Sequence, residues 1–295
     1  MRLLLLGAGG QLGQEITAAV TDIDLIGRTR AQTDIADPGA VAAALEQAQP
    51  DIVVNAAAYT KVDKAESERD EAFRVNATGA EAIAAACAQS QTPLIHLSTD
   101  YVFDGTKPTP YVETDPTAPL GVYGASKLAG EQAVRERHKK HVILRTSWVY
   151  GRFGSNFLKT ILRLASERDE LKVVADQRGS PTGTSDLAHA ILGLAPRLVS
   201  GAAEADWGTY HFTGEGETNW CQFADEILSR REKWVGSRPR LTPITTAEYP
   251  TAARRPSNSV MDNRTFRARF GLASKPWRQS VRESVDALMA PAPQR

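Results

Sequence analysis

The sequence predicts an α/β fold built on a doubly wound parallel sheet, with a smaller C-terminal lobe. Short apolar runs alternate with segments of helical periodicity through the first half of the chain. Strands and helices in this order imply right-handed crossovers and a parallel sheet that is covered on both faces. After Val149 the alternation becomes less regular and glycines and prolines interrupt it, which indicates the smaller lobe.

The expected elements follow from the same periodicities. In the first half we expect strands at residues 3–6, 24–27, 51–58, 93–99 and 141–147, and helices at 10–20, 38–47, 68–88 and 123–137. In the second half we expect strands at 171–174 and 210–213, helices at 157–167, 219–231, 264–270 and 278–288, and one ending near 199. The segment 237–263 is expected to lack regular structure. We therefore expect residues 1–150 to form the first domain, with its sheet completed by segments near 184–214, and residues 151–295 to form mainly the second lobe, interleaved with the first.

The composition excludes several classes of protein. Lys and Arg together number 35, as do Asp and Glu, so no net charge attracts the chain to nucleic acid or to an anionic membrane. Cys87 and Cys221 lie far apart in the sequence, which fits a reducing compartment and argues against a disulfide framework. The first apolar run stops at Gly7, too short for a signal peptide, and no stretch approaches the ~20 apolar residues of a membrane span. We expect a cytoplasmic protein with no nucleic-acid or membrane partner.

A glycine-rich turn, "GAGGQLG", follows the first strand and opens the first helix. Gly7 permits the tight turn, Gly10 lets a pyrophosphate approach the backbone, and Gly13 lets the helix pack closely on the strand. The free N–H groups at the helix N-terminus, where Gln11 and Leu12 lie, favour an anion. This arrangement predicts a dinucleotide cofactor bound by a Rossmann-type domain over residues 1–150.

The second strand bears on the choice of cofactor. It ends "LIGRTRAQTD", with no acid before Asp34 to bind the ribose hydroxyls of NAD. Arg28 is the better candidate for contact with the 2′-phosphate of NADP, and the alternative is a solvated loop arginine. Asp34 and Ile35 are also expected at this site. The small residues Ala56, Ala57 and Ala58 end another strand at the same edge and leave room for a flat ring. NADPH is favoured, with NADH as the alternative.

A candidate reacting centre follows the strand at 93–99. Ser98 and Thr99 end this strand at the edge where open α/β sheets bind ligands. Tyr123 and Lys127 are one helical turn apart on the next helix, so they share a face. A nearby ammonium lowers the pKa of a phenol from its usual value of about 10. Together with the Thr99 hydroxyl, such a pair suits carbonyl reduction, in which charge develops on the oxygen. An isolated pair of this kind is more often an exposed surface pair.

These residues resemble the extended short-chain dehydrogenase/reductase superfamily. The stretches "STDYVFDG", "PLGVYGASKLAGE", "RTSWVYG" and "DQRGSPTGTSDLA" closely resemble its dTDP-4-dehydrorhamnose reductase family, and the similarity runs over nearly the whole chain. The resemblance implies an enzyme that reduces the 4-keto group of dTDP-4-dehydro-L-rhamnose with NAD(P)H. It also makes the C-terminal lobe the substrate-binding lobe.

The resemblance also implies roles for individual residues. Tyr123 would be the acid, Lys127 would bind the nicotinamide ribose and tune the tyrosine, and Thr99 would help to hold the 4-keto oxygen. Further candidates around the nucleotide-sugar are Asp100, Trp148, Asn156, Arg254 and Asn258. For Trp148 the alternative is a core residue, and for Arg254 a solvated loop charge.

Metal binding and assembly stay open. Some members of the family bind Mg²⁺ at a dimer interface through a glutamate after the first glycines and acids after "PTG". Glu15 is present here, but Asp186 is the lone acid in "TSDLA", whereas a Mg²⁺ site needs several oxygen ligands. No metal site is predicted, Mg²⁺ remains an open question, and the chain is expected to be a monomer or a homodimer.

Two other functions fit many of the same residues. A nucleotide-sugar 4,6-dehydratase or epimerase would use the same scaffold, but such dehydratases carry an Asp-Glu pair after the threonine, and here Thr99 precedes Asp100 and Tyr101. A non-catalytic regulatory subunit, such as the reductase-like partner of methionine adenosyltransferase, would bind the dinucleotide without turning over a sugar.

Overall fold

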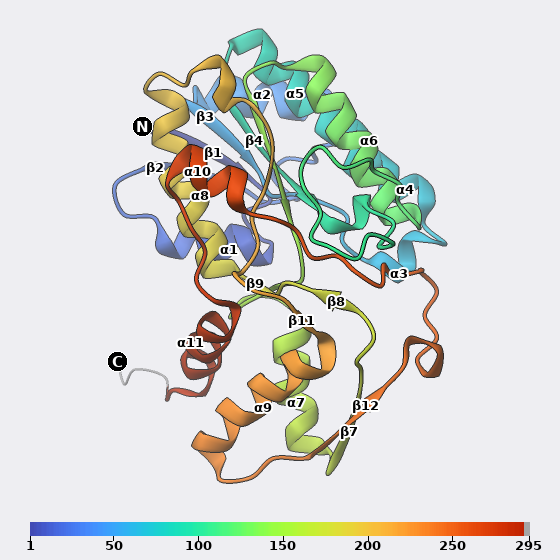
Figure 1. Ribbon diagram of the computed structural model, residues 1–295. Helices are drawn as coiled ribbons and strands as arrows, with labels where there is room; N and C mark the ends of the chain where they lie inside the picture. The colour runs from blue at the N-terminus through green and yellow to red at the C-terminus, as the bar shows by residue number, and fades with distance from the viewer. Residues whose placement is uncertain (292–295) are drawn as a thin grey trace.

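The computed structural model describes residues 1–291 and is built on a six-stranded parallel sheet (Figure 1). Its order is β10 (Gly208–His211), β5 (His141–Thr146), β4 (Leu94–Thr99), β3 (Ile52–Asn55), β1 (Arg2–Leu6) and β2 (Asp24–Arg28). Every neighbouring pair is parallel. The chain runs from β1 outward to β2 and then returns to β3, so the order reverses between β1 and β3. Ligands bind beside such a reversal, at the carboxyl ends of the strands. The predicted fold class is confirmed.

Helices cover both faces of this sheet (Figure 1). One face packs against α1 (Gln11–Ala19), α8 (Thr184–Val199) and α10 (Arg264–Phe270), and the other against α2 (Pro38–Ala48), α5 (Gly79–Ser90) and α6 (Val122–Arg137). Side chains alternate between the faces along each strand. Leu3 and Leu5 of β1 therefore enter the first core, and Leu4 and Leu6 enter the second. This double burial explains why the strand reads as a continuous apolar run.

The helix predicted at 68–88 is interrupted. It consists of α4 (Arg69–Phe73), a π-helical turn (Arg74–Thr78) and α5, and the short α3 (Val62–Ala65) precedes it. Asn76 lies in the π-helical turn, accepts a 2.8 Å hydrogen bond from the Tyr59 amide and donates to Ser126 on α6. Such turns often occur at functional sites. Here it ties the loop after β3 to the helix that carries Tyr123.

The remaining elements surround a third core beneath the sheet, where Figure 1 shows α7, α9 and α11. They are β6 (Val149–Tyr150), α7 (Phe157–Glu167), β7 (Glu170–Val174), β8 (Arg178–Gly179), β9 (Thr182–Gly183), β11 (Thr218–Asn219), α9 (Trp220–Val235), β12 (Arg240–Ile244) and α11 (Trp277–Met289). Short 3₁₀ turns lie at Asp100–Val102, Glu204–Asp206 and Thr246–Glu248. β12 pairs with β7, so the expectation of no regular structure over 237–263 is wrong there.

The chain order of the two regions is interleaved. Helix α8, strand β10 and helix α10 belong to the second half of the sequence, yet they pack on or join the large sheet. Within residues 1–291, no helix combines the length and the apolar character that crossing a bilayer requires.

Candidate active site

A cavity of about 720 Å³ lies over the carboxyl ends of β1, β3 and β4. Its lining residues come from stretches that lie far apart in the sequence. Of the residues predicted for the site, it is lined by Gly7, Gly10, Gln11, Leu12, Asp34, Ile35, Ala56, Ala57, Ala58, Tyr123 and Lys127. The glycine turn and the Tyr123–Lys127 pair therefore face one space.

The glycine turn at its base depends on close backbone packing. Gly7 has a φ of 87°, and a Cβ atom there would lie 2.6 Å from the Ala57 amide nitrogen. Gly13 lies beneath the turn rather than in the cavity, because a Cβ atom would approach the Gly7 carbonyl oxygen to 2.2 Å. Gly13 therefore acts on the shape of the turn and not by contact with a ligand.

The N-terminus of α1 fits a pyrophosphate. Gly10 is the N-cap residue, and no side chain caps the first amide groups of the helix. These amides carry partial positive charge, and Gln11 and Leu12 line the cavity beside them. The residues present therefore fit a dinucleotide.

At the other end of the cavity, the two arginines at the end of β2 and just after it, Arg28 and Arg30, differ in position. Arg28, the residue expected at the 2′-phosphate, donates instead to Gln47 Oε1 at 3.1 Å and does not line the cavity. Arg30 does line it, and its guanidinium pairs with Glu71 at 2.9 Å. The neighbouring Arg74 bridges Glu71 and Asp34. At this end of the cavity, the cation among the lining residues is thus Arg30 and not Arg28.

Tyr123 and Lys127 lie one turn apart on α6, where Lys127 is buried and Tyr123 is partly buried. The Lys127 ammonium donates to the Leu97 carbonyl oxygen of β4 at 2.6 Å. Burial lowers the pKa of Lys127 to about 8, against the opposing influence of Glu131. Burial also raises the pKa of Tyr123 to about 12, with a smaller opposing effect from the Thr99 hydroxyl. The expected lowering of the tyrosine pKa by the ammonium is therefore not present in this structure.

Thr99 and Asp100 adjoin this pair at the end of β4. The Thr99 hydroxyl donates to Asp100 Oδ1 at 3.0 Å, and the ring of Tyr101 packs edge-on against that of Tyr123. Asp100 is 2% exposed and its Oδ2 atom has no hydrogen-bond partner within residues 1–291. Burial raises the pKa of Asp100 to about 6, although the hydrogen bond from Thr99 favours its charged form.

Two of the residues expected around the sugar, Trp148 and Asn156, are held by contacts within the protein. Trp148 has a φ of 47°, which is rare for a bulky residue, and its ring stacks on Trp220 with centroids 3.6 Å apart. Asn156 caps α7 by accepting from the Lys159 amide, and its own amide group donates to Gln11 Oε1 and to the Gly151 carbonyl oxygen. Neither Trp148 nor Asn156 lines the main cavity. Gln11 does line it, and the hydrogen bond from Asn156 holds the Gln11 side chain in place.

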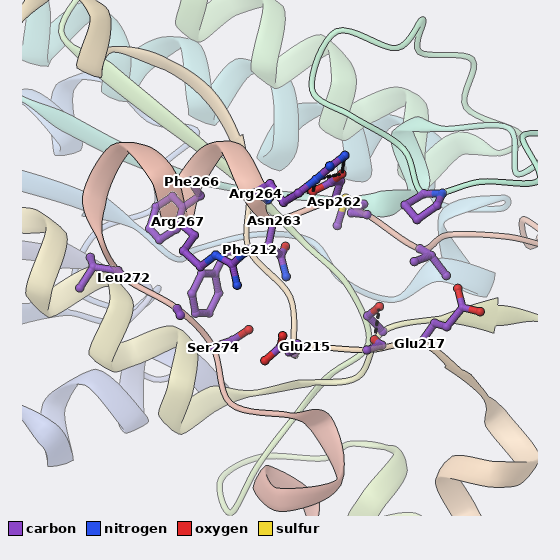
Figure 2. Close-up of a pocket in the computed structure, with 17 residues that line it drawn as sticks. Phe212, Glu215, Glu217, Asp262, Asn263, Arg264, Phe266, Arg267, Leu272 and Ser274 are labelled. Atoms are coloured by element: carbon purple, nitrogen blue, oxygen red, sulfur yellow. Dashed lines mark hydrogen bonds and ion pairs between the residues drawn. The ribbon is translucent and has the colours of Figure 1, made fainter.

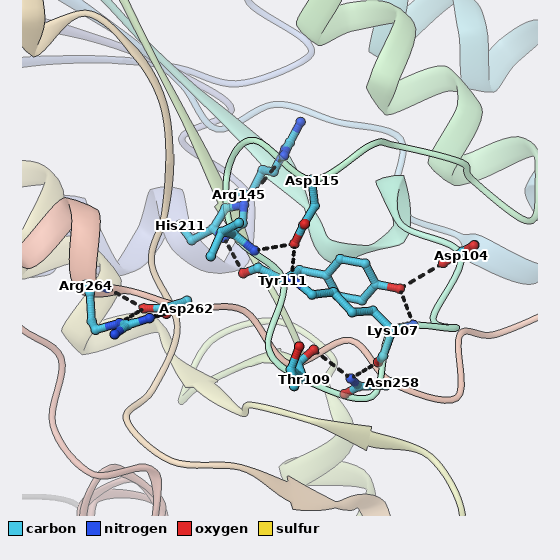
Figure 3. Close-up of polar contacts among 11 residues, drawn as sticks. Asp104, Lys107, Thr109, Tyr111, Asp115, Arg145, His211, Asn258, Asp262 and Arg264 are labelled. Atoms are coloured by element: carbon cyan, nitrogen blue, oxygen red, sulfur yellow. Dashed lines mark hydrogen bonds and ion pairs between the residues drawn. The ribbon is translucent and has the colours of Figure 1, made fainter.

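The two C-terminal candidates, Arg254 and Asn258, also lie outside the lining of the main cavity. Asn258 is buried and donates to the Lys107 and Thr109 carbonyl oxygens, which closes the loop shown in Figure 3. Arg254 is exposed, whereas the adjacent Arg255 forms a two-point ion pair with Asp63 after β3. The structure thus brings Arg255, rather than Arg254, against the Rossmann domain.

Glu15 does not offer a free carboxylate for a metal. Its Oε1 atom pairs with Arg152 at 3.0 Å and its Oε2 atom accepts from Thr184 at 2.9 Å. Asp186 bonds to Ser280 instead. Among residues 1–291, no three His, Cys, Asp or Glu side chains are grouped as ligands for an ion. These residues do not fit a Mg²⁺ site.

A second cavity of about 320 Å³ lies beyond β10 (Figure 2). Its lining includes the apolar residues Phe212, Phe266 and Leu272 and the charged residues Glu215 and Arg267. None of the residues predicted for the site lines it.

Sequence reasoning missed several residues of the main cavity. Those nearest to predicted positions are Gly9, Thr29, Arg30, Ala31, Thr33, Tyr59, Thr60 and Leu97. They adjoin strand ends, so the edge rule used for Ala56–Ala58 could have found them. Thr146, Val149, Gly154, Ser155 and Leu187 come from elsewhere in the chain, and Val75 lies in the π-helical turn, which periodicity does not reveal.

Comparison with known proteins identifies the family. The family model described as "RmlD substrate binding domain" matches residues 1–290. The chain belongs to the RmlD family. A similar curated relative in this family is the dTDP-4-dehydrorhamnose reductase of Sinorhizobium fredii, 46% identical over 290 residues and covering 98% of each chain.

Solved structures agree with this membership of the RmlD family. The dTDP-4-dehydrorhamnose reductase from Bacillus anthracis, solved in complex with NADP, is 38% identical with a TM-score of 0.89, covering 96% of this chain and 98% of that one. The dTDP-4-dehydrorhamnose reductase from Clostridium acetobutylicum is also 38% identical, with a TM-score of 0.91, and the match covers 98% of this chain and 100% of that one.

Proposed function

We propose that the chain catalyses the NADPH-dependent reduction of the 4-keto group of dTDP-4-dehydro-L-rhamnose, which gives dTDP-L-rhamnose. The observation that carries this proposal is that the glycine turn, Tyr123 and Lys127 line one and the same cavity in a member of the RmlD family. Its relatives include dTDP-4-dehydrorhamnose reductases that match it over nearly their whole length.

The chemistry requires a proton donor where the carbonyl oxygen gains charge. When bound, NADPH supplies the hydride that becomes the new C4–H bond. The electrons of the carbonyl double bond move to oxygen, and the phenol proton of Tyr123 moves to that oxygen, so that an alcohol and a phenolate result. The positive charge of the Lys127 ammonium stabilises the phenolate until a proton from solvent replaces the one that Tyr123 gave up.

The other residues of the site orient the reactants. The amides of Gln11 and Leu12 would hold the pyrophosphate of the coenzyme, and the ammonium of Lys127 its nicotinamide ribose. Thr99 would share the hydrogen bond to the keto oxygen. Arg30 is the proposed partner of the 2′-phosphate because it faces the cavity and no acid precedes Asp34 after β2. NADH is the alternative coenzyme.

Stoichiometry tests the reaction directly. The purified chain is mixed with NADPH, dTDP-4-keto-6-deoxy-glucose and the 3,5-epimerase that converts this sugar to the proposed substrate. We expect one NADPH oxidised for each sugar reduced, and no oxidation without the epimerase. A dehydratase or an epimerase would change the sugar with no net loss of NADPH, and a regulatory subunit would bind NADPH and leave the sugar unchanged.

The remaining assignments belong to the same proposal. The nucleotide-sugar is the partner, the chain acts as a monomer or a homodimer, and its location is the cytoplasm. Both Cys87 and Cys221 carry free thiols, which supports a reducing compartment.

A further inference from the structure

Glu131 is a buried carboxylate that lies one helical turn beyond Lys127 on α6. Its side chain is fully inaccessible to solvent. Positions four residues apart share a helix face, so Tyr123, Lys127 and Glu131 follow one another along the side of α6 that meets the sheet. A buried charge is costly unless it is paired, which raises the question of what Glu131 does there.

Both oxygens of Glu131 are fully engaged. Oε1 accepts from the Ser98 hydroxyl at 2.6 Å and from Arg145 Nε at 2.9 Å. Oε2 accepts from Arg145 Nη2 at 2.7 Å and from Arg135 Nη2 at 2.6 Å. Although burial opposes ionisation, the hydrogen bonds and charge of Arg145 lower the pKa of Glu131, so the group is a carboxylate at neutral pH.

These bonds join α6 to the strands beneath it next to the residue that holds Lys127. Ser98 is the residue that follows Leu97 in β4, and the Leu97 carbonyl oxygen holds the Lys127 ammonium. Two successive residues of β4 thus hold two successive turns of α6. Arg145 adds β5 as a third point, because it lies opposite Ser98 in the sheet. The position of Lys127 over the cavity depends on this arrangement.

We propose that Glu131 is a positioning residue for the reaction: it fastens α6 to β4 and β5, and it places a carboxylate one helical turn behind the Lys127 ammonium. This inference rests on the proposed function, which assigns Lys127 to the nicotinamide ribose. Glu131 itself does not line the cavity and acts through Lys127.

The other titratable groups around Lys127 do not supply this charge. His96 of β4 stays neutral, because burial and the Lys127 charge lower its pKa. Tyr123 is neutral at pH 7, and Arg135 and Arg145 are cations already paired with Glu131. Among the residues described, Glu131 is the group that raises the pKa of Lys127 against the effect of burial.

The pH dependence of NADPH binding separates this role from a merely structural one. In the unmodified protein the affinity should fall as pH rises through about 8, where Lys127 loses its proton. In Glu131→Gln the ammonium loses its counter-charge, so the fall should move to lower pH by on the order of one unit. An unchanged midpoint in the variant overturns the inference.

Glu226 offers a matched control. It is also a nearly buried carboxylate held by two arginines, Arg278 at 2.8 Å and Arg282 at 2.6 Å, but it lies on α9 outside the cavity. We expect Glu226→Gln to lower the thermal stability and to leave the midpoint of NADPH binding in place. If the midpoint of NADPH binding shifts equally in Glu226→Gln, the shift results from lost stability, and the proposed role of Glu131 is contradicted.

A second variant keeps the inference testable if Glu131→Gln does not fold. Replacing Glu131 and Arg145 together by glutamine leaves no uncompensated buried charge at this pair. We expect the midpoint again at lower pH, and an unchanged midpoint overturns the inference. The failure of the proposed function looks different: an affinity of the unmodified protein that stays constant from neutral to strongly alkaline pH contradicts the role of Lys127 itself.

Discussion

The Lys127 ammonium and the Leu97 carbonyl oxygen lie 2.6 Å apart, so the protein itself fastens this lysine to β4. The pKa of the neighbouring Tyr123 stays high, at about 12, because the phenol is buried. The sequence alone favoured a tyrosine whose pKa is lowered by the lysine. A protonated phenol is nonetheless the form that reduction requires, since the oxygen of the forming alcohol takes up its proton.

Coenzyme choice should depend on Arg30 and not on Arg28. Arg30→Gln removes the cation that faces the cavity, so we expect NADPH affinity to fall about three- to tenfold while NADH affinity changes little. Arg28→Gln is the control, because Arg28 donates to Gln47 outside the cavity. Titration of both coenzymes into both variants measures the effect. An equal loss for NADPH and NADH would contradict a contact with the 2′-phosphate.

Asp100 should cost the protein stability at neutral pH. Its folded-state pKa of about 6 exceeds the usual value near 4, so the folded protein holds this proton more tightly than the unfolded chain. Stability therefore falls as pH rises from about 4 through about 6. We expect Asp100→Asn to raise the free energy of unfolding by roughly 1–3 kcal/mol at pH 7.5 and by almost nothing at pH 4, in urea denaturation.

Asp104 is the control for this pH dependence. Hydrogen bonds from the Thr106 amide and from the Tyr111 hydroxyl lower the pKa of Asp104, which is the opposite direction. Its stabilising contribution is present above the unfolded pKa and is lost at lower pH. Asp104→Asn should therefore destabilise the protein at pH 7.5. A gain for Asp100→Asn that is the same at both pH values would show that burial of its charge is not the cause.

The glycine turn should tolerate a methyl group at one position and not at another. A Cβ atom at Gly13 would lie 2.2 Å from the Gly7 carbonyl oxygen, and backbone must move to relieve this contact. We expect Gly13→Ala to lower the free energy of unfolding by more than about 2 kcal/mol. At Gly9 the nearest atom would be Thr29 Cγ2 at 3.6 Å, an ordinary contact, so Gly9→Ala should unfold at nearly the same temperature as the unmodified chain. Similar losses in both variants would contradict this explanation.

Much of the fold could be predicted because burial on both faces leaves a strong signal in the sequence. The strand predicted at residues 3–6 is β1, which begins one residue earlier, at Arg2. β12 gave a weaker signal, since it contains Pro243, which usually argues against a strand, and it pairs with β7 alone. The π-helical turn at Arg74–Thr78 keeps helical periodicity on either side, so the sequence predicted one continuous helix there.

The site was harder to predict than the fold. The strand-edge rule led to Ala56–Ala58 and to the glycine turn, because position in the sheet decides what they face. Asn156 shows the limit of such reasoning: a polar residue near a ligand site either contacts the ligand or caps a helix, and here its amide is bonded within the protein. The choice between Arg28 and Arg30 depended on where β2 ends, and helix or strand ends are poorly determined by pattern.

The most direct test compares turnover with coenzyme binding in Tyr123→Phe. Phenylalanine keeps the ring that packs against Tyr101 and removes the proton, so we expect sugar-dependent NADPH oxidation to fall about 10²- to 10⁴-fold. NADPH affinity should stay within about twofold. Tyr210→Phe is the control, since that hydroxyl bonds to carbonyl oxygens outside the cavity, and it should react at the normal rate. Unchanged turnover in Tyr123→Phe would contradict the assignment of Tyr123 as the proton donor.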